Sequence, residues 1–299
     1  MSNPHLTLAY FGLPLGAYLL ARDGHEFSFT VLPALPGPGR RRLRHLLRER
    51  VLDAAVLGPA LDQAVECAWA GAEPDLLVSW FWPRRLPEQW LIRPPLGAIG
   101  THPSLLPRHR GPNPYYWAID SGDLESGVTV HRLTAEFDRG AILASAKLAI
   151  GERNAWQLAR ALDRPSLQLM RETVAALARG EQRAGKEQNE ALATWAPEPD
   201  TDELKVSWQW STARVLRRIR ALGPVPGLAI EIRGVRLFVT AGRAASEFPA
   251  ALYPGEAATL PGPPAQVVIR TGDGALSIEE ALLNTDTDAD PAPLTGAEV

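Results

Sequence analysis

Apolar residues in the first half of the chain form short runs that alternate with segments of helical periodicity. The short runs predict strands over Leu6–Phe11, Phe27–Leu32, Asp75–Trp80, Leu96–Ile99 and Gly127–His131. The segments between them predict helices over Pro14–Ala21, Arg40–Asp53, Leu61–Ala72 and Pro112–Asp120. Strands that alternate with helices are typical of a mainly parallel sheet covered on both faces, so we expect an α/β fold for this half.

The pattern changes in the second half. A helical repeat over Trp156–Ala178 predicts a long helix that is broken or kinked at Pro165, and Leu204–Leu222 predicts another. The remaining apolar runs are short and separated by Gly/Pro turns, which is typical of a small β-barrel; they are Leu228–Ile232, Val235–Thr240 and Gln266–Thr271. We therefore predict a first domain over 1–190, a polar linker over 191–203, a second domain over 204–285 and a disordered tail over 286–299.

Composition places the chain among soluble globular proteins, with 45% apolar and 22% charged residues. The net charge of −3 supplies no general attraction to nucleic acid. The single cysteine, Cys67, excludes an intrachain disulfide, and its place in a predicted helix favours a buried structural thiol over a nucleophile. We find no signal peptide and no membrane-spanning run, so we expect a cytoplasmic protein that does not contact a membrane, with a monomer compatible with these observations.

The most informative segment is His102–Gly111, which reads His-Pro-Ser-Leu-Leu-Pro-Arg-His-Arg-Gly and is followed downstream by Asp138. Prolines restrict the backbone around His102 and hold it on a stiff loop. An imidazole titrates near neutrality, and a carboxylate on its far nitrogen selects the tautomer and raises its basicity. Because His102 follows a predicted strand, it would lie at the carboxyl edge of the sheet, where sites form in such folds. We expect His102 and Asp138 to lie about 3–6 Å apart and to transfer protons.

This string resembles the signature of the folate-dependent formyltransferases, Asn-x-His-x-Ser-Leu-Leu-Pro-x-x-Arg-Gly. That family includes methionyl-tRNA formyltransferase and the sugar-nucleotide N-formyltransferases. Similarity continues in Ala193–Pro197, which looks like the family's linker, in Ile219–Gly227 and in the turn Thr271–Gly274. The resemblance implies a Rossmann-like catalytic domain, a C-terminal OB-like barrel, 10-formyltetrahydrofolate as cosubstrate, an amine acceptor and no metal. The first turn, Phe11–Pro14, lacks the Gly-rich dinucleotide fingerprint, which excludes nicotinamide or flavin binding.

The resemblance gives His102 the role of polarising the formyl oxygen or relaying a proton, and Asp138 the role of orienting it. One position departs from the family: Gly100 stands where the family has an Asn that holds the formyl oxygen and the amine. Loss of one such donor typically costs on the order of 10²–10³ in rate. Three explanations remain open: Asn113 or Thr101 supplies the donor, the acyl donor or acceptor differs, or catalysis is lost while binding persists. Asn113 is equally suited to capping the next helix.

The resemblance also implies where the folate binds. Related enzymes wrap a loop around the pterin at the place of Ser79–Pro87, whose aromatic residues suit a flat ring and whose arginines suit the glutamate tail. The same aromatic residues are equally suited to a core, and exposed arginines need bind nothing. The predicted folate contacts are Phe81, Trp82, Arg84, Arg85, Leu86, Ser104 and Leu105.

The acceptor is open between methionyl-tRNA and a small amine such as an amino sugar or a hydroxamate precursor. The basic run Arg40–Arg48 stands where the tRNA enzymes of the family insert a basic loop, and Arg214–Arg220 adds further arginines. The excess of acid over base in residues 200–299 argues against tRNA, because phosphate contacts dominate nucleic-acid affinity. Two alternative functions also remain, a catalytically impaired folate-binding homologue and a hydrolase that releases formate from the same donor.

Overall fold

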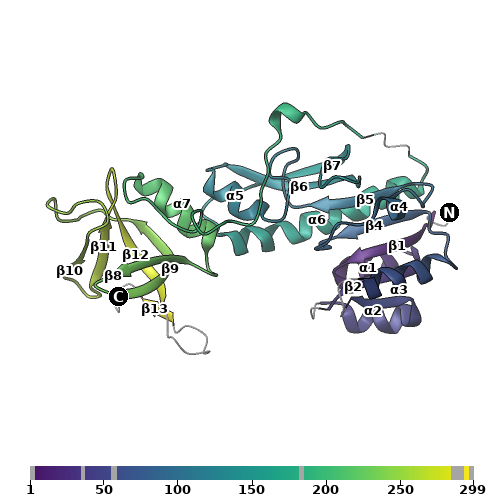
Figure 1. Cartoon of the computed structure of the whole chain (residues 1–299), viewed down its shortest axis with the longest axis horizontal. Helices are drawn as coiled ribbons and strands as arrows, with labels where there is room; N and C mark the ends of the chain where they lie inside the picture. Colours follow the sequence, from purple (N-terminus) through teal and green to yellow (C-terminus); the bar gives the residue numbers. More distant parts are fainter. Residues whose placement is uncertain (1–3, 35–37, 55–58, 182–184, 284–292, 296–299) are drawn as a thin grey trace. The chain divides into compact units, whose positions relative to one another are not determined.

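The computed structural model describes residues 4–34, 38–54, 59–181, 185–283 and 293–295 (Figure 1). The chain divides into two compact units, each assembled from more than one segment. The first unit comprises Met1–Pro112, Gly127–Lys147 and Leu162–Trp195, and the second comprises Asn113–Ser126, Leu148–Ala161 and Ala196–Val299. No helix of the described residues is long and apolar enough to cross a membrane.

A seven-stranded sheet in the order β3-β2-β1-β4-β5-β6-β7 is the framework of the first unit. Neighbouring strands from β3 to β5 are parallel, and β6 runs antiparallel to β5. The strands are β1 (Thr7–Gly12), β2 (Glu26–Pro33), β3 (Val51–Ala54), β4 (Leu76–Trp80), β5 (Ala98–His102), β6 (Glu125–Arg132) and β7 (Ile142–Ala149). The expected mainly parallel α/β fold is confirmed.

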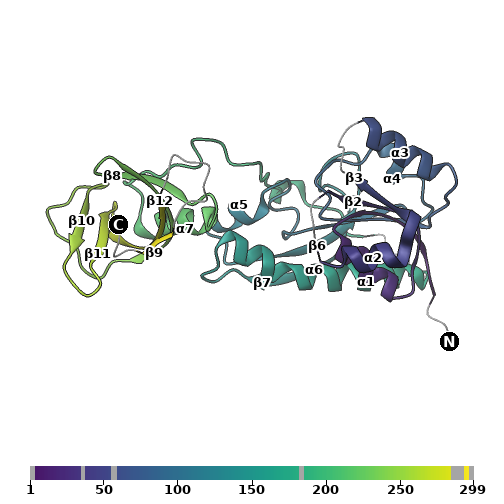
Figure 2. The ribbon, with the colours of Figure 1, turned by 90° about the horizontal axis from the view of Figure 1, so that it is seen from below.

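Helices cover both faces of this sheet, as the continuous apolar runs require. On β1, Leu8 and Tyr10 enter one core cluster, whereas Ala9 and Phe11 enter the other, because successive strand residues point to opposite faces. Figure 2 shows α3 and α4 on one side of the strands and α1, α2 and α6 on the other. The helices are α1 (Pro14–Arg22), α2 (Arg40–Leu47), α3 (Pro59–Trp69), α4 (Glu88–Leu91) and α6 (Ala155–Ala178), with short 3₁₀ helices η1 (Arg48–Arg50) and η2 (Glu190–Leu192).

Two local predictions are wrong for identifiable reasons, one for a helix and one for the cysteine. The helix predicted over Arg40–Asp53 ends at Leu47, because Val51–Ala54 instead forms β3 and pairs with β2. The predicted long helix is present as α6, which continues through Pro165 without a break. Cys67 is exposed, not buried. The core residues of α3 are Leu61, Val65 and Trp69, spaced one turn apart, and Cys67 lies off that stripe.

The second unit contains an antiparallel sheet in the order β10-β11-β12-β9-β8, with β13 paired to β12. Its strands are β8 (Leu228–Ile232), β9 (Val235–Ala244), β10 (Ala257–Leu260), β11 (Gln266–Arg270), β12 (Ala275–Leu283) and β13 (Pro293–Thr295). Figure 1 shows this sheet curled into a partial barrel, which is consistent with the predicted OB-like fold. The helices α5 (Pro114–Asp120) and α7 (Thr212–Leu222) belong to this unit, which also contains the first residues of α6.

Two predictions about this half need correction. The helix predicted over Leu204–Leu222 starts only at Thr212, where the Ser211 side chain accepts a hydrogen bond from the Arg214 N–H and caps it. The predicted disordered tail is wrong at Pro293–Thr295, which pairs with β12 as β13. The rest of that tail, 286–292 and 296–299, lies outside the described residues.

A buried ion pair joins α5 to α7 within the second unit. Arg218 donates from Nε to Asp120 Oδ1 at 2.7 Å and from a terminal nitrogen to Oδ2 at 3.0 Å. Both side chains are nearly inaccessible, at 4% and 6% exposure. The same guanidinium also donates to the carbonyls of Glu203 and Lys205, so it fixes the backbone that precedes α7. Planar guanidinium geometry suits this bidentate arrangement, which a lysine would not reproduce.

Candidate active site

Strands β5 and β6 bring the candidate residues onto one face of the sheet. His102 is the last residue of β5, and Gly100 lies two residues before it on the same face. Across the antiparallel pair, His131 is directly opposite Gly100 and Thr129 is directly opposite His102. Side chains of directly opposed residues share a face. A second histidine therefore lies beside His102, and Thr101 points to the other face.

The His102 ring has contacts at both nitrogens. Nε2 lies 2.7 Å from the carbonyl oxygen of His109. A carbonyl only accepts, so Nε2 carries a proton. Nδ1 faces Asp138 Oδ2 at 3.5 Å, and the side chain is 8% exposed. The structure thus brings the predicted pair together within the expected separation.

Asp138 lies between two imidazoles and is the most accessible of the three groups, at 15% exposure. Its Oδ2 accepts a hydrogen bond from the Gly111 N–H at 2.9 Å, and its Oδ1 lies 3.6 Å from His131 Nε2. The residue has φ +54°, in the left-handed region that Asp tolerates better than most residues. This turn aims the carboxylate back toward the end of β5.

His131 is a site residue that the sequence did not single out. It is 2% exposed, and its Nδ1 donates to the carbonyl of Arg132 at 2.9 Å. Burial lowers the pKa of His131 to about 4, against the opposing influence of the Asp138 carboxylate, so the ring is neutral at pH 7. The one signal in the sequence is a polar residue at the end of the apolar run Gly127–His131.

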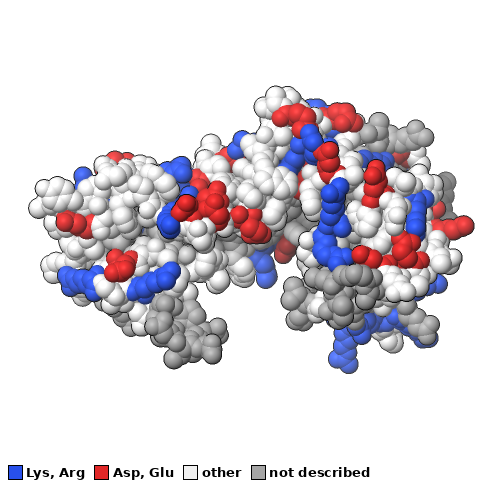
Figure 3. Space-filling model, viewed as in Figure 1, with Lys and Arg blue, Asp and Glu red and all other residues white. Residues whose placement is uncertain are grey.

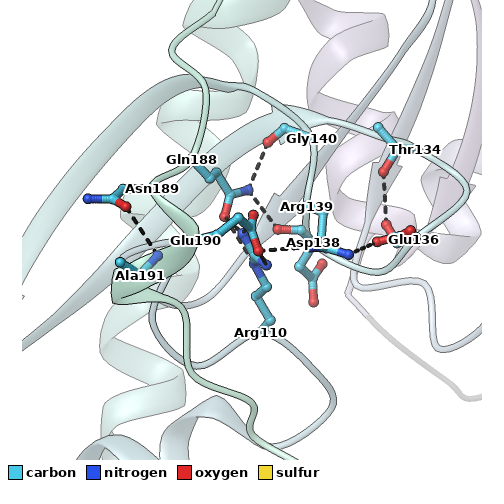
Figure 4. A network of polar contacts seen from close by, with 10 residues as sticks. All are labelled: Arg110, Thr134, Glu136, Asp138, Arg139, Gly140, Gln188, Asn189, Glu190 and Ala191. Carbon is cyan, nitrogen blue, oxygen red and sulfur yellow. Dashed lines mark hydrogen bonds and ion pairs between the residues drawn. The ribbon is translucent and has the colours of Figure 1, made fainter.

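A polar network holds the loop that carries Asp138 (Figure 4). Gln188 donates from Nε2 to the carbonyls of Asp138 at 2.7 Å and Gly140 at 2.8 Å. Its Oε1 accepts from Arg110, which also pairs with Glu190 at 2.8 Å. Hydrogen bonds from Arg110 lead the effects that lower the pKa of Glu190 to about 2. The segment around Gln188 therefore clamps both loops that flank the His102–Asp138 pair.

Known proteins match almost the whole chain. Residues 48–173 match the family model described as formyl transferase, and residues 200–290 match the formyl transferase C-terminal domain. A methionyl-tRNA formyltransferase from Ralstonia nicotianae is 30% identical over 295 residues, covering 92% of this chain and 90% of its own. The chain belongs to the formyltransferase family.

Solved structures support the fold of this formyltransferase. HypX from Aquifex aeolicus, in complex with tetrahydrofolic acid, aligns with 98% of the chain at a TM-score of 0.64 and 22% identity. The alignment covers 46% of HypX, so the chain spans about half of that protein. An N-formyltransferase from Helicobacter canadensis, in complex with folinic acid and dTDP-3-aminofucose, aligns with 91% of this chain and 98% of its own, at a TM-score of 0.67 and 14% identity.

In this formyltransferase, Leu133 fills the space beside Gly100, where the resemblance led us to expect a carboxamide. A Cβ atom added to Gly100 would lie 2.5 Å from Leu133 Cδ2 and 3.6 Å from His131 Nε2. The backbone of Gly100 is outside the left-handed region, so its conformation does not demand glycine. Packing, rather than backbone strain, is what opposes a side chain at this position.

The two suggested substitute donors are engaged or turned elsewhere. Asn113 belongs to the second unit and caps α5, where its Oδ1 accepts from the Tyr116 N–H at 3.4 Å. Its Nδ2 donates to Glu198 Oε2 at 3.1 Å, so both ends of the carboxamide have partners. Thr101 points away from the face of His102, and its buried hydroxyl has no hydrogen-bond partner among the described residues. The capping role weighed for Asn113 is the one that its contacts support.

The loop after β4 contains polar atoms suited to a ligand. Trp82 packs edge-on against Phe11 with ring centroids 5.6 Å apart. Its buried Nε1 and the Nε of Arg84 have no partner among the residues that the structure describes. Phe81 is half-buried with φ +53°, which turns the chain at the end of β4. Unpaired buried donors are costly, so these atoms fit a bound molecule with acceptor groups.

The other predicted folate contacts divide between surface, core and loop. Arg85 is exposed, whereas Leu86 is buried in the core cluster beside α3 and α4. Ser104 is buried, and its hydroxyl donates to the carbonyl of Arg108 at 2.6 Å. Leu105 packs against Gly127, where an added Cβ would lie 2.5 Å from it. In the structure, Leu86, Ser104 and Leu105 therefore shape the fold around the site.

Proposed function

We propose that this protein transfers the formyl group of 10-formyltetrahydrofolate to the amino group of methionyl-tRNA. The observation that carries the proposal is the His102–Asp138 pair, 3.5 Å apart at the end of β5. The pair occurs in a chain that matches a methionyl-tRNA formyltransferase over nine-tenths of both sequences. We also propose a cytoplasmic location, with which a single exposed cysteine is compatible.

The side chains present can carry out the proton transfers of an acyl transfer. The bound donor would supply the formyl carbon as electrophile and its N10 nitrogen as leaving group, and the Trp82 loop would hold its ring. The Nε2–H of His102 already donates to one carbonyl oxygen, that of His109. A formyl oxygen placed beside this N–H would share it, and the N–H would then stabilise the developing negative charge. Asp138, as the most accessible group, accepts the proton lost by the amine.

The acceptor assignment is supported by the basic helix α2. Its arginines Arg41, Arg42 and Arg44 are exposed, while Leu43 is buried and anchors the helix to the core. Figure 3 shows Lys and Arg side chains projecting at the lower edge of the first unit, where Figure 1 places α2. Such a row of guanidinium groups suits the phosphates of a polyanion. A small amine would need no such surface.

The experiment is a formylation assay with methionyl-tRNA and, separately, with small primary amines. We expect transfer to methionyl-tRNA, a loss of about 10²–10⁴-fold in rate for His102→Gln and for Asp138→Asn, and unchanged folding. Charge reversal at Arg41 and Arg42 should weaken tRNA binding and reduce its salt dependence. The matched control is Arg160→Glu, an exposed arginine on α6.

Other outcomes point to the alternative functions. Transfer to a small amine but not to methionyl-tRNA would identify a small-molecule formyltransferase. Formate release without any acceptor would identify a hydrolase. Calorimetric binding of the folate without turnover would identify a catalytically impaired homologue. Each result would overturn the proposed activity or its acceptor.

A further inference from the structure

We propose that His131 is the third member of a proton-sharing cluster with Asp138 and His102, and that it acts as a positioning residue for the transfer reaction. This inference rests on the function proposed above. It starts from a feature of the geometry that the His102–Asp138 pair alone does not explain. A second imidazole faces the other oxygen of the same carboxylate, 3.6 Å from it.

The hydrogen bonds determine the tautomer of both rings. His102 Nε2 and His131 Nδ1 each contact a backbone carbonyl, at 2.7 and 2.9 Å. Carbonyls only accept, so each of these nitrogens carries a proton. The nitrogens that face Asp138 are then lone-pair acceptors whenever the rings are neutral. Separations of 3.5 and 3.6 Å are longer than hydrogen bonds, as expected for lone pairs facing a carboxylate with no proton between them.

The Asp138 carboxylate and the two ring nitrogens that face it can together accept one proton. A proton entering at either oxygen of Asp138 can bridge to a ring nitrogen, or reside on that nitrogen and donate back. The ionisable groups that act on His131 are Asp138, which favours its protonation, and His102 and Arg110, which oppose it. Burial opposes it most strongly, so His131 stays neutral until the cluster receives a proton.

His131 lies beside Gly100, the position at which the sequence differs from the family signature. The two residues are directly opposite each other on β5 and β6, and His131 Nε2 is the polar atom nearest to the place of the missing side chain. Leu133 closes the rest of that place. A carboxamide at position 100 would have placed a polar group beside the Asp138 carboxylate. In this chain the imidazole of His131 is the polar group beside that carboxylate.

The reaction requires a group that accepts one proton and donates one proton, and the cluster can do both. The amine nitrogen forms a bond to the formyl carbon, and the bond from that carbon to N10 of the folate breaks. One proton leaves the amine nitrogen and one proton must reach N10. The cluster accepts the first at Asp138, holds it against His102 or His131, and returns a proton to N10. No oxidant, reductant or further reactant is needed.

The direct test is nitrogen-15 NMR of the histidine rings in the wild-type protein at pH 7. We expect His131 to carry its proton on Nδ1 and to be neutral, and His102 to carry a proton on Nε2. A neutral His131 with its proton on Nε2, or a His131 ring that titrates near pH 6.5, would overturn the cluster. This measurement needs no substrate, so it is independent of the proposed activity.

The kinetic test compares His131→Leu with His25→Leu, which removes another buried histidine of the same unit that contacts the Leu6 N–H. We expect His131→Leu to lower kcat about 10²-fold, to change the pH profile of kcat and to leave the KM for the folate unchanged. His131→Gln should recover part of the rate, because an amide can still donate to the Arg132 carbonyl. If His131→Leu and His25→Leu show the same pH profile as wild type, His131 is only a packing residue.

The two proposals fail in different ways. If the NMR tautomers are as expected but no amine is formylated, the cluster exists and the proposed function is wrong. If formylation occurs and His131→Leu leaves kcat and its pH profile unchanged, the function holds and the role of His131 is wrong.

Discussion

The substitution Gly100→Asn tests the prediction that Gly100 stands where the family has an Asn. A Cβ at this position would lie 2.5 Å from Leu133 Cδ2, a separation that packed carbon atoms do not adopt. Cδ2 is the end of the half-buried Leu133 side chain and can move aside, so the cost should be about 1 kcal/mol, the low end of the overpacking range. For a domain of this size, that corresponds to a decrease of about 2–4 °C in Tm. We expect Gly100→Asn alone to be destabilised and to gain no activity.

The combination with Leu133→Ala should relieve the clash. Leu133 is half-buried, so the second substitution itself costs less than the roughly 2–5 kcal/mol of a fully buried leucine. The double variant should lose less free energy of unfolding than the two single variants lose together, by about 1 kcal/mol. A coupling of this kind is expected of residues in contact. With space for the carboxamide, formyl transfer should rise by up to about 10²–10³, the contribution of one restored donor.

The measurements are thermal unfolding and the formylation assay, carried out on Gly100→Asn, Leu133→Ala and the double variant. The control is Gly71→Asn, because an added Cβ at Gly71 meets no atom within 4 Å and should leave Tm unchanged. A Gly100→Asn protein with the stability of wild type, or one that transfers faster without the change at Leu133, would refute the claim that Leu133 occupies this place.

Three further predictions concern stability and positioning. The pKa of His131 in the folded protein, about 4, lies below the ordinary value of 6.5, so between these pH values the unfolded chain binds more protons than the folded one. The free energy of unfolding should therefore be highest above about pH 6.5 and fall as the pH decreases toward 4. Urea unfolding of His131→Leu should show a smaller decrease over the same pH range. Asp120→Ala leaves Arg218 buried and uncompensated, so it should lower the free energy of unfolding by about 3–5 kcal/mol, whereas replacing both residues by apolar ones should cost less, as denaturant titration would show. Gln188→Ala should release the loop of Asp138 and lower kcat by up to about 10²-fold while calorimetry shows unchanged folate binding; an unaltered rate would exclude a positioning role.

Much of this protein was determined by short-range features of its sequence. The strand predicted over Leu228–Ile232 has those bounds in the structure, and the helix predicted from Pro14 differs by one residue at its end. Periodicity succeeds at such elements because the side chains of one strand or helix decide which face is buried. The motif from His102 to Gly111 likewise indicated the family, since its residues are consecutive and can be recognised without the fold, and its prolines restrict the backbone around His102.

The tertiary structure alone decided what depends on pairing between distant segments. Val51–Ala54 is a strand because β2 is beside it, although its own sequence also allowed a helix. His131 joins the site only because β6 pairs with β5 in a register that sets it opposite Gly100. A shift of one residue would turn His131 to the other face. The same pairing brings Leu133 to the space beside Gly100. Periodicity predicts neither the position of His131 nor that of Leu133, because it indicates which residues are buried but not which residue lies opposite on the next strand.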